Sequence, residues 1–157
     1  KIDKADAGFY IKRFKQAYTG LSQWQKKVEH DIAKNGFAKT IFGRHRCLGN
    51  GISPNMDYEE KWKWYAAVRE LTNHIIQGSG ADLLKIAMVK IVGEFAKIKL
   101  QARIATSTHD SVTIECLDNP EVIEKVKQIL TSCMEVKVGS ILLPIDVQIK
   151  KSFSKNY

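Results

Sequence analysis

Residues 101–116 of the 157-residue chain read QARIATSTHDSVTIEC, and this stretch decides the fold class. Its apolar side chains recur at every second position, which is typical of a strand with one buried face. We therefore predict two strands, Arg103–Thr108 and Ser111–Cys116, joined tightly at His109 and Asp110. A hairpin this short indicates an antiparallel sheet.

The sequence before this hairpin is mostly helical in pattern. Apolar residues recur at three- and four-residue steps over Asp6–Tyr18 and over Ser22–Lys34, with Thr19-Gly20 between them. Asn35-Gly36 is a typical helix stop. The segment Phe37–Leu48 is rich in β-branched and aromatic residues and is expected to be extended, and a Gly- and Pro-containing loop follows it.

A long helical stretch follows from Asp57, whose carboxylate could cap it, and continues to Phe95. Gly78 and Gly80 interrupt its pattern, and each costs roughly 1 kcal/mol relative to Ala in a helix. The two glycines therefore need a reason. One explanation is that another backbone or a ligand approaches closely at these positions. The alternative is a simple kink or a short loop between two helices.

After the hairpin the sequence predicts one more helix and one more strand. Asp118-Asn119-Pro120-Glu121 is a typical helix start, and Ile141–Ile149 is expected to be a strand, with Pro144 indicating an edge position or a bulge. Helices followed by strands, without a regular βαβ alternation, predict an α+β fold. We expect helices packed on a small antiparallel sheet that carries the hairpin.

Length and composition favour one soluble globular domain, because 44% of the residues are apolar and no apolar run approaches the ~20 residues of a membrane span. Three cysteines without a CxxC pair argue against a disulfide framework or a zinc site and for a reducing compartment. The first residue is Lys1 rather than Met, so we expect a trimmed, processed or partial chain.

The net charge is +8, and it is unevenly distributed. Residues 1–75 hold 14 basic and 8 acidic side chains, whereas residues 76–157 hold 11 and 9. Such an excess, mixed with tryptophan and tyrosine, suits a polyanion such as nucleic acid. The alternative is that the charge serves solubility alone.

Asp110 is the first candidate for chemistry. A carboxylate at a tight turn between two apolar strands is held rigidly yet reaches solvent, as a metal ligand must. The alternative is a turn residue that satisfies local backbone groups. Two-metal nucleotidyl transfer needs at least two carboxylates, with the ions ~3.5–4 Å apart, so a second one would have to come from elsewhere.

Arg69, Asn73 and Gln77 are spaced four apart and lie along one face of the predicted long helix. Such a row suits phosphates and the acceptors of the DNA minor groove, which are alike for A·T and T·A, but it could also be a solvated polar face. The basic cluster Arg44–Arg46 could hold a phosphate backbone or could be an exposed strand end.

Taken in order, these segments resemble the C-terminal part of the family A DNA polymerases, the bacterial DNA polymerase I type. GFAKTIFGRHR at 36–46 is similar to that family's GYVET-x-x-GRRR segment. Arg69–Asp82 follows its R-x-x-x-N-x-x-x-Q-G-(S/T)-x-A-D pattern, and Thr108–Ser111 is similar to its V-H-D-E palm hairpin. The apolar strand at 142–145 stands in the same order.

The resemblance implies a role for each matching residue. Asp110 would bind the catalytic Mg²⁺ ions as one of two essential carboxylates, and His109 would lie close to the primer terminus. The row of Arg69, Asn73 and Gln77 would contact the primer-template, and Arg44 and Arg46 would add to DNA binding. The whole chain, 1–157, would be the C-terminal part of a polymerase domain, with 1–35 the helical segment after the fingers and 36–157 a palm portion.

Two departures from the family pattern stand out. Ser111 replaces the Glu that usually follows the catalytic Asp. The family's D-x-S-x-x-E strand and its Arg, Lys and Tyr-Gly nucleotide-binding helix are missing from this chain. The resemblance therefore implies that the chain needs an upstream polymerase portion, as the same chain before cleavage or as a separate subunit, and that alone it is inactive.

With that portion, the enzyme would extend a DNA primer with dNTPs by two-Mg²⁺ nucleotidyl transfer, without a membrane partner. It would work in a bacterial or phage-infected cytoplasm or in an organelle of bacterial descent. The alternative is a non-catalytic DNA-binding module that keeps the palm shape, for which Ser111 would be the sign.

Overall fold

The computed structural model of the chain describes residues 3–152. It divides into two compact units, Lys1–Ser79 and Gly80–Tyr157. The division expected between residues 35 and 36 concerns polymerase subdomains and stays a prediction. No helix of the described part is long and apolar enough to cross a membrane.

The first unit begins with two helices, and local chemistry sets their ends. Asp3 caps the first, because its carboxylate accepts a hydrogen bond of 2.8 Å from the amide of Asp6. The break between them falls at Tyr18 (φ −112°, ψ 63°), one residue before the predicted Thr19-Gly20. Gly36, at φ 75°, ends the second helix in the left-handed conformation, as predicted. The elements are α1 Lys4–Ala17 and α2 Thr19–Asn35.

Residues 37–48 are only partly extended. Phe37–Lys39 (β1) and His45–Cys47 (β2) pair antiparallel, and the chain turns back between them through residues 40–44. Gly43 lies in that turn at φ 91°, a conformation that favours glycine. The expectation of one extended segment was therefore wrong over the turn, because alternation of residue types does not reveal where a chain reverses.

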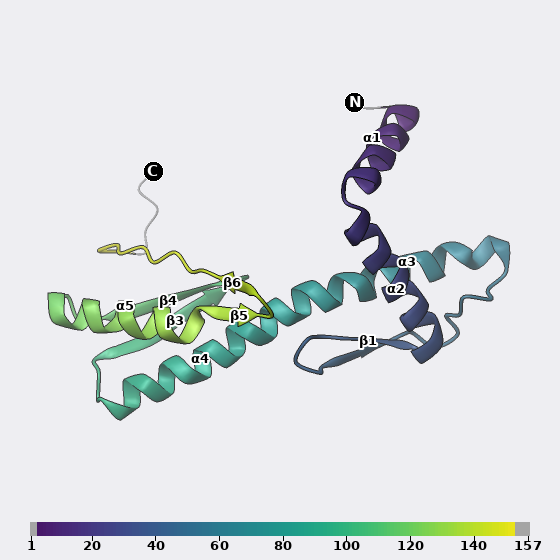
Figure 1. The fold of residues 1–157 in the computed structure, drawn as a ribbon. Coiled ribbons are helices and arrows are strands. Elements are labelled where there is room, and N and C mark those ends of the chain that lie inside the picture. The colour runs from purple at the N-terminus through teal and green to yellow at the C-terminus, as the bar shows by residue number, and fades with distance from the viewer. Residues whose placement is uncertain (1–2, 153–157) are drawn as a thin grey trace. The chain divides into compact units, whose positions relative to one another are not determined.

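The long helical stretch follows a loop and changes its geometry along its length. A 3₁₀ turn, η1 (Tyr58–Glu60), precedes α3 (Lys61–Asn73), and a π-helical turn, η2 (His74–Gly78), follows it. The side chain of Asp57 makes no capping hydrogen bond, so the predicted cap is wrong. Figure 1 shows α2 and β1 beside α3. Together these elements bury Val28, Ile32, Ala38, Trp64 and Leu71.

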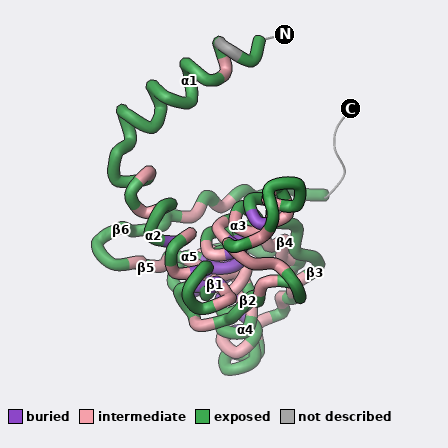
Figure 2. Tube along the Cα trace, turned by 90° about the vertical axis from the view of Figure 1, so that its right-hand side faces the viewer, coloured by how far each residue is buried: buried purple, intermediate pink, exposed green. Residues whose placement is uncertain are grey.

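The helix α1 contributes little to this core. Figure 2 shows it exposed along most of its length. Its large apolar side chains are about half exposed or more, among them Tyr10 (59%) and Phe14 (52%). The first unit therefore has an apolar helix surface that no other described part of the unit covers.

The second unit consists of helices and a hairpin around one core. Ile91 and Phe95 of the first helix pack with Val126, Leu130 and Cys133 of the last, and apolar residues of the hairpin join them. Figure 1 shows the last helix running along the hairpin. The elements are α4 Ser79–Lys97, β3 Ala102–Thr108, β4 Ser111–Cys116, α5 Pro120–Met134, β5 Val136–Val138 and β6 Ile141–Leu143.

The predicted start of α5 is confirmed, since the Asn119 side chain accepts hydrogen bonds from the amides of Glu121 and Val122. The last strand is shorter than predicted. It ends at Leu143, before Pro144, and pairs with β5, which the sequence did not indicate. The described strands form three separate two-stranded ribbons, so the α+β class is confirmed, with ribbons in place of one sheet.

Candidate functional site

The hairpin of the second unit presents Asp110 at its tip. Thr108 pairs with Ser111, which leaves His109 and Asp110 as a two-residue loop. His109 adopts φ 55°, a left-handed conformation that is uncommon outside glycine. The Ser111 hydroxyl donates to the Thr108 carbonyl at 2.9 Å and so ties the two strand ends together. Asp110 is exposed on a short, hydrogen-bonded loop.

Asp110 fits a metal ion only as one member of a larger set. Within residues 3–152, no group of three or more His, Cys, Asp or Glu side chains is arranged to hold a metal. A carboxylate oxygen is a suitable ligand for Mg²⁺.

The polar row lies in the first unit. Arg69 and Asn73 are on α3, Gln77 is in the π turn, and all three side chains are exposed. Arg69 and Asn73 line an open groove of about 440 Å³ between α1, α2 and α3. Lys15 and Lys26 also line the groove, together with one acidic residue, Glu29. Its lining therefore carries more positive than negative charge.

Sequence reasoning missed Lys15 and Lys26 as neighbours of the row. They precede Arg69 by more than 40 residues, and only the packing of α2 against α3 brings that part of the chain to the row. The uneven charge of residues 1–75 was the one signal that pointed toward them.

The basic cluster 44–46 does not form one patch. The Arg44 guanidinium donates to the carbonyl of Gly78 at 3.0 Å. The His45 ring stacks on Phe37 with centroids 4.4 Å apart. Arg46 forms an exposed ion pair with Glu70 of α3. Each of the three side chains therefore engages a different neighbour.

The two glycines of the long helix have different surroundings. A Cβ on Gly78 would lie 3.0 Å from Thr40 Cγ2 and 3.0 Å from the His74 ring, whereas a Cβ on Gly80 would meet nothing within 4 Å. The helix passes through both residues without a loop. Gly78 is therefore explained by close approach, in this case of side chains of the same unit.

The predicted site residues fall into two groups. Arg44, Arg46, Arg69, Asn73 and Gln77 lie in the first unit. His109 and Asp110 lie in the second. Each group is exposed to solvent and has its own supporting structure.

Comparison with known proteins identifies the class to which this α+β chain belongs. It is similar to the solved structure of the POL domain of Pol1 from M. smegmatis in complex with DNA primer-template and dNTP, with a TM-score of 0.74 and 25% identity. The match covers 85% of this chain and 22% of that one. The fold is thus that of a portion of a polymerase domain.

The sequence model of DNA polymerase family A matches residues 1–157, and the chain belongs to this family. It is 33% identical over 149 residues to DNA polymerase I of Borreliella burgdorferi, covering 95% of this chain and 16% of that protein. It is 30% identical over 150 residues to the thermostable DNA polymerase I of Thermus thermophilus, covering 94% and 16%. The chain spans about a sixth of the length of these relatives, and the predicted resemblance is confirmed.

Proposed function

We propose that the chain is the C-terminal palm portion of a DNA-directed DNA polymerase that adds dNTPs to a primer 3′-hydroxyl. The observation that carries the proposal is the match of the DNA polymerase family A model to the whole chain, 1–157. The exposed acidic hairpin tip and the exposed amide-bearing helix support it, because one offers a metal ligand and the other a surface for DNA.

Asp110 is proposed as one of two carboxylates that hold the catalytic Mg²⁺ ions. The bound ions would stabilise the attacking and leaving oxygens of the transfer. The tight loop exposes Asp110, and the Ser111–Thr108 hydrogen bond joins the two ends of the loop. His109, its neighbour in the loop, is proposed to lie close to the primer terminus. The second carboxylate belongs to the upstream portion.

Primer-template binding is proposed for the surface that contains Arg69, Asn73 and Gln77. An arginine can bind phosphate, and the two amides can donate to minor-groove acceptors that do not depend on sequence. Lys15 and Lys26 in the adjoining groove add positive charge. Arg44 and Arg46 are proposed to contribute to primer-template binding as well. Arg46 would give up its ion pair with Glu70 to bind a phosphate.

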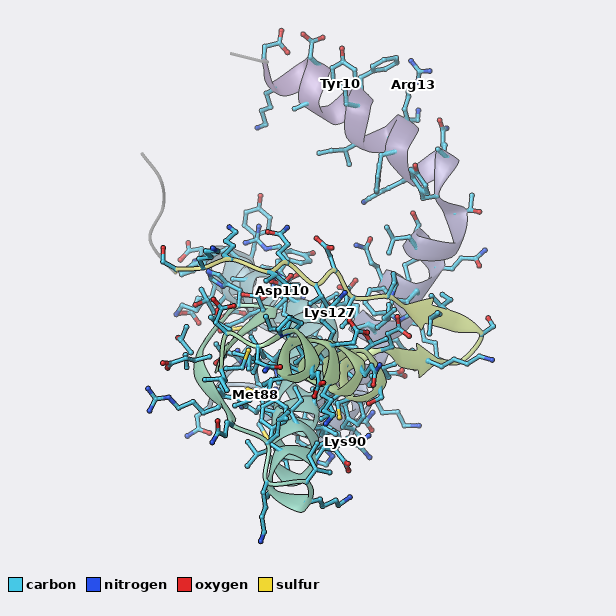
Figure 3. All side chains as sticks on the ribbon, turned by 90° about the vertical axis from the view of Figure 1, so that its left-hand side faces the viewer. Tyr10, Arg13, Met88, Lys90, Asp110 and Lys127 are labelled. Carbon is cyan, nitrogen blue, oxygen red and sulfur yellow. The ribbon has the colours of Figure 1, made fainter. Side chains whose placement is uncertain are left out.

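The upstream polymerase portion is proposed to cover α1. Figure 3 shows Tyr10 and Arg13 extending outward from this helix. Apolar side chains this exposed over consecutive turns are unfavourable in water and are typical of a protein interface. The chain spans about a sixth of the length of its relatives, which supports a partner segment of the same polymerase.

A second candidate is a non-catalytic DNA-binding module. The observation in its favour is Ser111, whose hydroxyl bonds to Thr108 where the family usually has a carboxylate. Primer extension by this chain mixed with the polypeptide encoded upstream separates the two. Synthesis that depends on Mg²⁺ supports the polymerase, and DNA binding without synthesis supports the module.

A further inference from the structure

Hydrogen bonds connect the β1–β2 turn to Gly78, the last residue of the π turn, and to Ser79, the residue after it. The Ile41 amide donates to Ser79 Oγ at 3.1 Å, and Arg44 Nη2 donates to the Gly78 carbonyl at 3.0 Å. The Ser79 hydroxyl also donates to the Ile75 carbonyl. We call Thr40, Arg44, Gly78 and Ser79 the turn clamp.

Three of the four residues of the turn clamp are buried, whereas Arg44 is exposed. Thr40 and Ser79 are only 3% and 7% exposed. Thr40 Oγ1 accepts from the Arg44 amide at 3.1 Å, which closes the turn directly before β2. Gly78 leaves no room for a side chain between Thr40 and His74. The π turn is therefore held from the side by a separate element.

The π turn has a geometric consequence for the polar row. In an α-helix, four residues exceed one turn of about 3.6 residues, so each step of four rotates forward by about 40°. Hydrogen bonds in a π turn run from i to i+5, so four residues fall short of a full turn there. The step from Asn73 to Gln77 lies almost wholly in η2. The π turn therefore reverses the forward drift and brings Gln77 back toward the line of Arg69 and Asn73.

We infer that Arg44 is a positioning residue for primer-template binding, which holds the π turn through the Gly78 carbonyl and thereby keeps Gln77 in line with Asn73. This rests on the proposed function, since it deepens the role of the polar row. Arg44 is suited to the task because a planar guanidinium can bind a carbonyl with one nitrogen and direct its other donors elsewhere. A lysine would keep the charge and lose this geometry.

The test is a double-mutant cycle on the 157-residue chain, with binding to a fluorescent primer-template measured by anisotropy. We expect Gln77→Ala to weaken binding about tenfold and Arg44→Lys three- to tenfold. The double variant should bind no more weakly than Gln77→Ala alone, because both changes remove the same contact. The salt dependence of Arg44→Lys should equal that of the unchanged chain, since no phosphate contact is lost.

A second measurement does not depend on DNA. Amide hydrogen exchange at residues 75–79 should be faster in Arg44→Lys than in the unchanged chain. Ser79→Ala removes the two hydrogen bonds of the Ser79 hydroxyl, to Ile41 and Ile75, and should likewise weaken primer-template binding and speed exchange at residues 75–79. Arg103→Lys is the matched control, because Arg103 is an exposed arginine bound to Glu115 at 2.8 Å and lies outside the clamp.

If the affinity losses of Arg44→Lys and Gln77→Ala multiply in the double variant, the inference is overturned, because Arg44 would then bind DNA independently of Gln77. Unchanged hydrogen exchange would overturn it as well. If the proposed DNA surface itself is wrong, the outcome is distinguishable. The unchanged chain would then show no primer-template binding, or Gln77→Ala would not change the affinity. The hydrogen-exchange measurement would still report on the turn clamp.

Discussion

At the scale of single residues, the proposed DNA surface contains charges that are already paired. Arg46 forms its ion pair with Glu70, and both side chains are about half exposed. Such pairs contribute roughly 0–1 kcal/mol to stability, so the guanidinium is readily given up to a phosphate. Glu70, the residue next to Arg69, also places a negative charge beside the row.

Glu70→Gln should therefore strengthen primer-template binding two- to threefold, because it frees Arg46 and removes a charge that repels phosphate. Its free energy of unfolding should change by less than about 0.5 kcal/mol. Fluorescence anisotropy and urea unfolding measure the two quantities. Glu115→Gln, which breaks the pair with Arg103, is the control. If Glu70→Gln binds DNA no more tightly than the unchanged chain, the proposed role of Arg46 in DNA binding is contradicted.

At the scale of elements, the long helix depends on the difference between its two glycines. Gly78→Ala should lower the free energy of unfolding by about 1–2 kcal/mol, because the gain in helix propensity is outweighed by crowding against Thr40 and His74. Gly80→Ala should raise it by about 0.5–1 kcal/mol, since its surroundings are open. Thermal and urea unfolding of both variants give the comparison. Equal effects at the two positions would argue against the tight packing at the π turn.

The sequence predicted elements well where a local signal was strong. The stop at Gly36, the cap at Asn119 and the two-residue loop at His109 and Asp110 all depend on chemistry within a few residues. Prediction from the sequence failed where an element forms only through pairing with another segment of the chain. Strand β5 has only three residues and exists because β6 pairs with it.

The candidate site divides in the same way. The residue types and spacing of the row and of Asp110 were visible in the sequence, and the structure exposes all of them. The contact of Arg44 with Gly78 and the groove with Lys15 and Lys26 were not visible, because each joins segments more than 30 residues apart. Only tertiary packing creates such neighbours.

At the scale of the whole molecule, the distribution of charge predicts how DNA binding responds to salt. The basic residues proposed to contact phosphates lie in residues 1–75, which carry six of the eight net positive charges. Each phosphate neutralised on duplex DNA adds about −0.9 to the slope of log K against log salt. Three contacts, from Arg46, Arg69 and one lysine of the groove, should give a slope of about −3.

Anisotropy titrations from low to physiological salt measure this slope. A weak affinity with a slope near zero would mean that the charge serves solubility alone. A slope that persists after Arg69→Gln and Lys26→Gln would place the DNA elsewhere on the chain.

The central proposal is that Asp110 is a metal ligand of a polymerase, and primer extension tests it most directly. This chain is combined with the proposed upstream polymerase portion, and nucleotide incorporation is measured with Mg²⁺ for the unchanged chain, Asp110→Asn and the control Asp118→Asn. We expect Asp110→Asn to lower synthesis at least about 100-fold, because a ligand of the ions that stabilise the reacting oxygens is lost, while primer-template binding persists. Normal extension by Asp110→Asn would contradict the account.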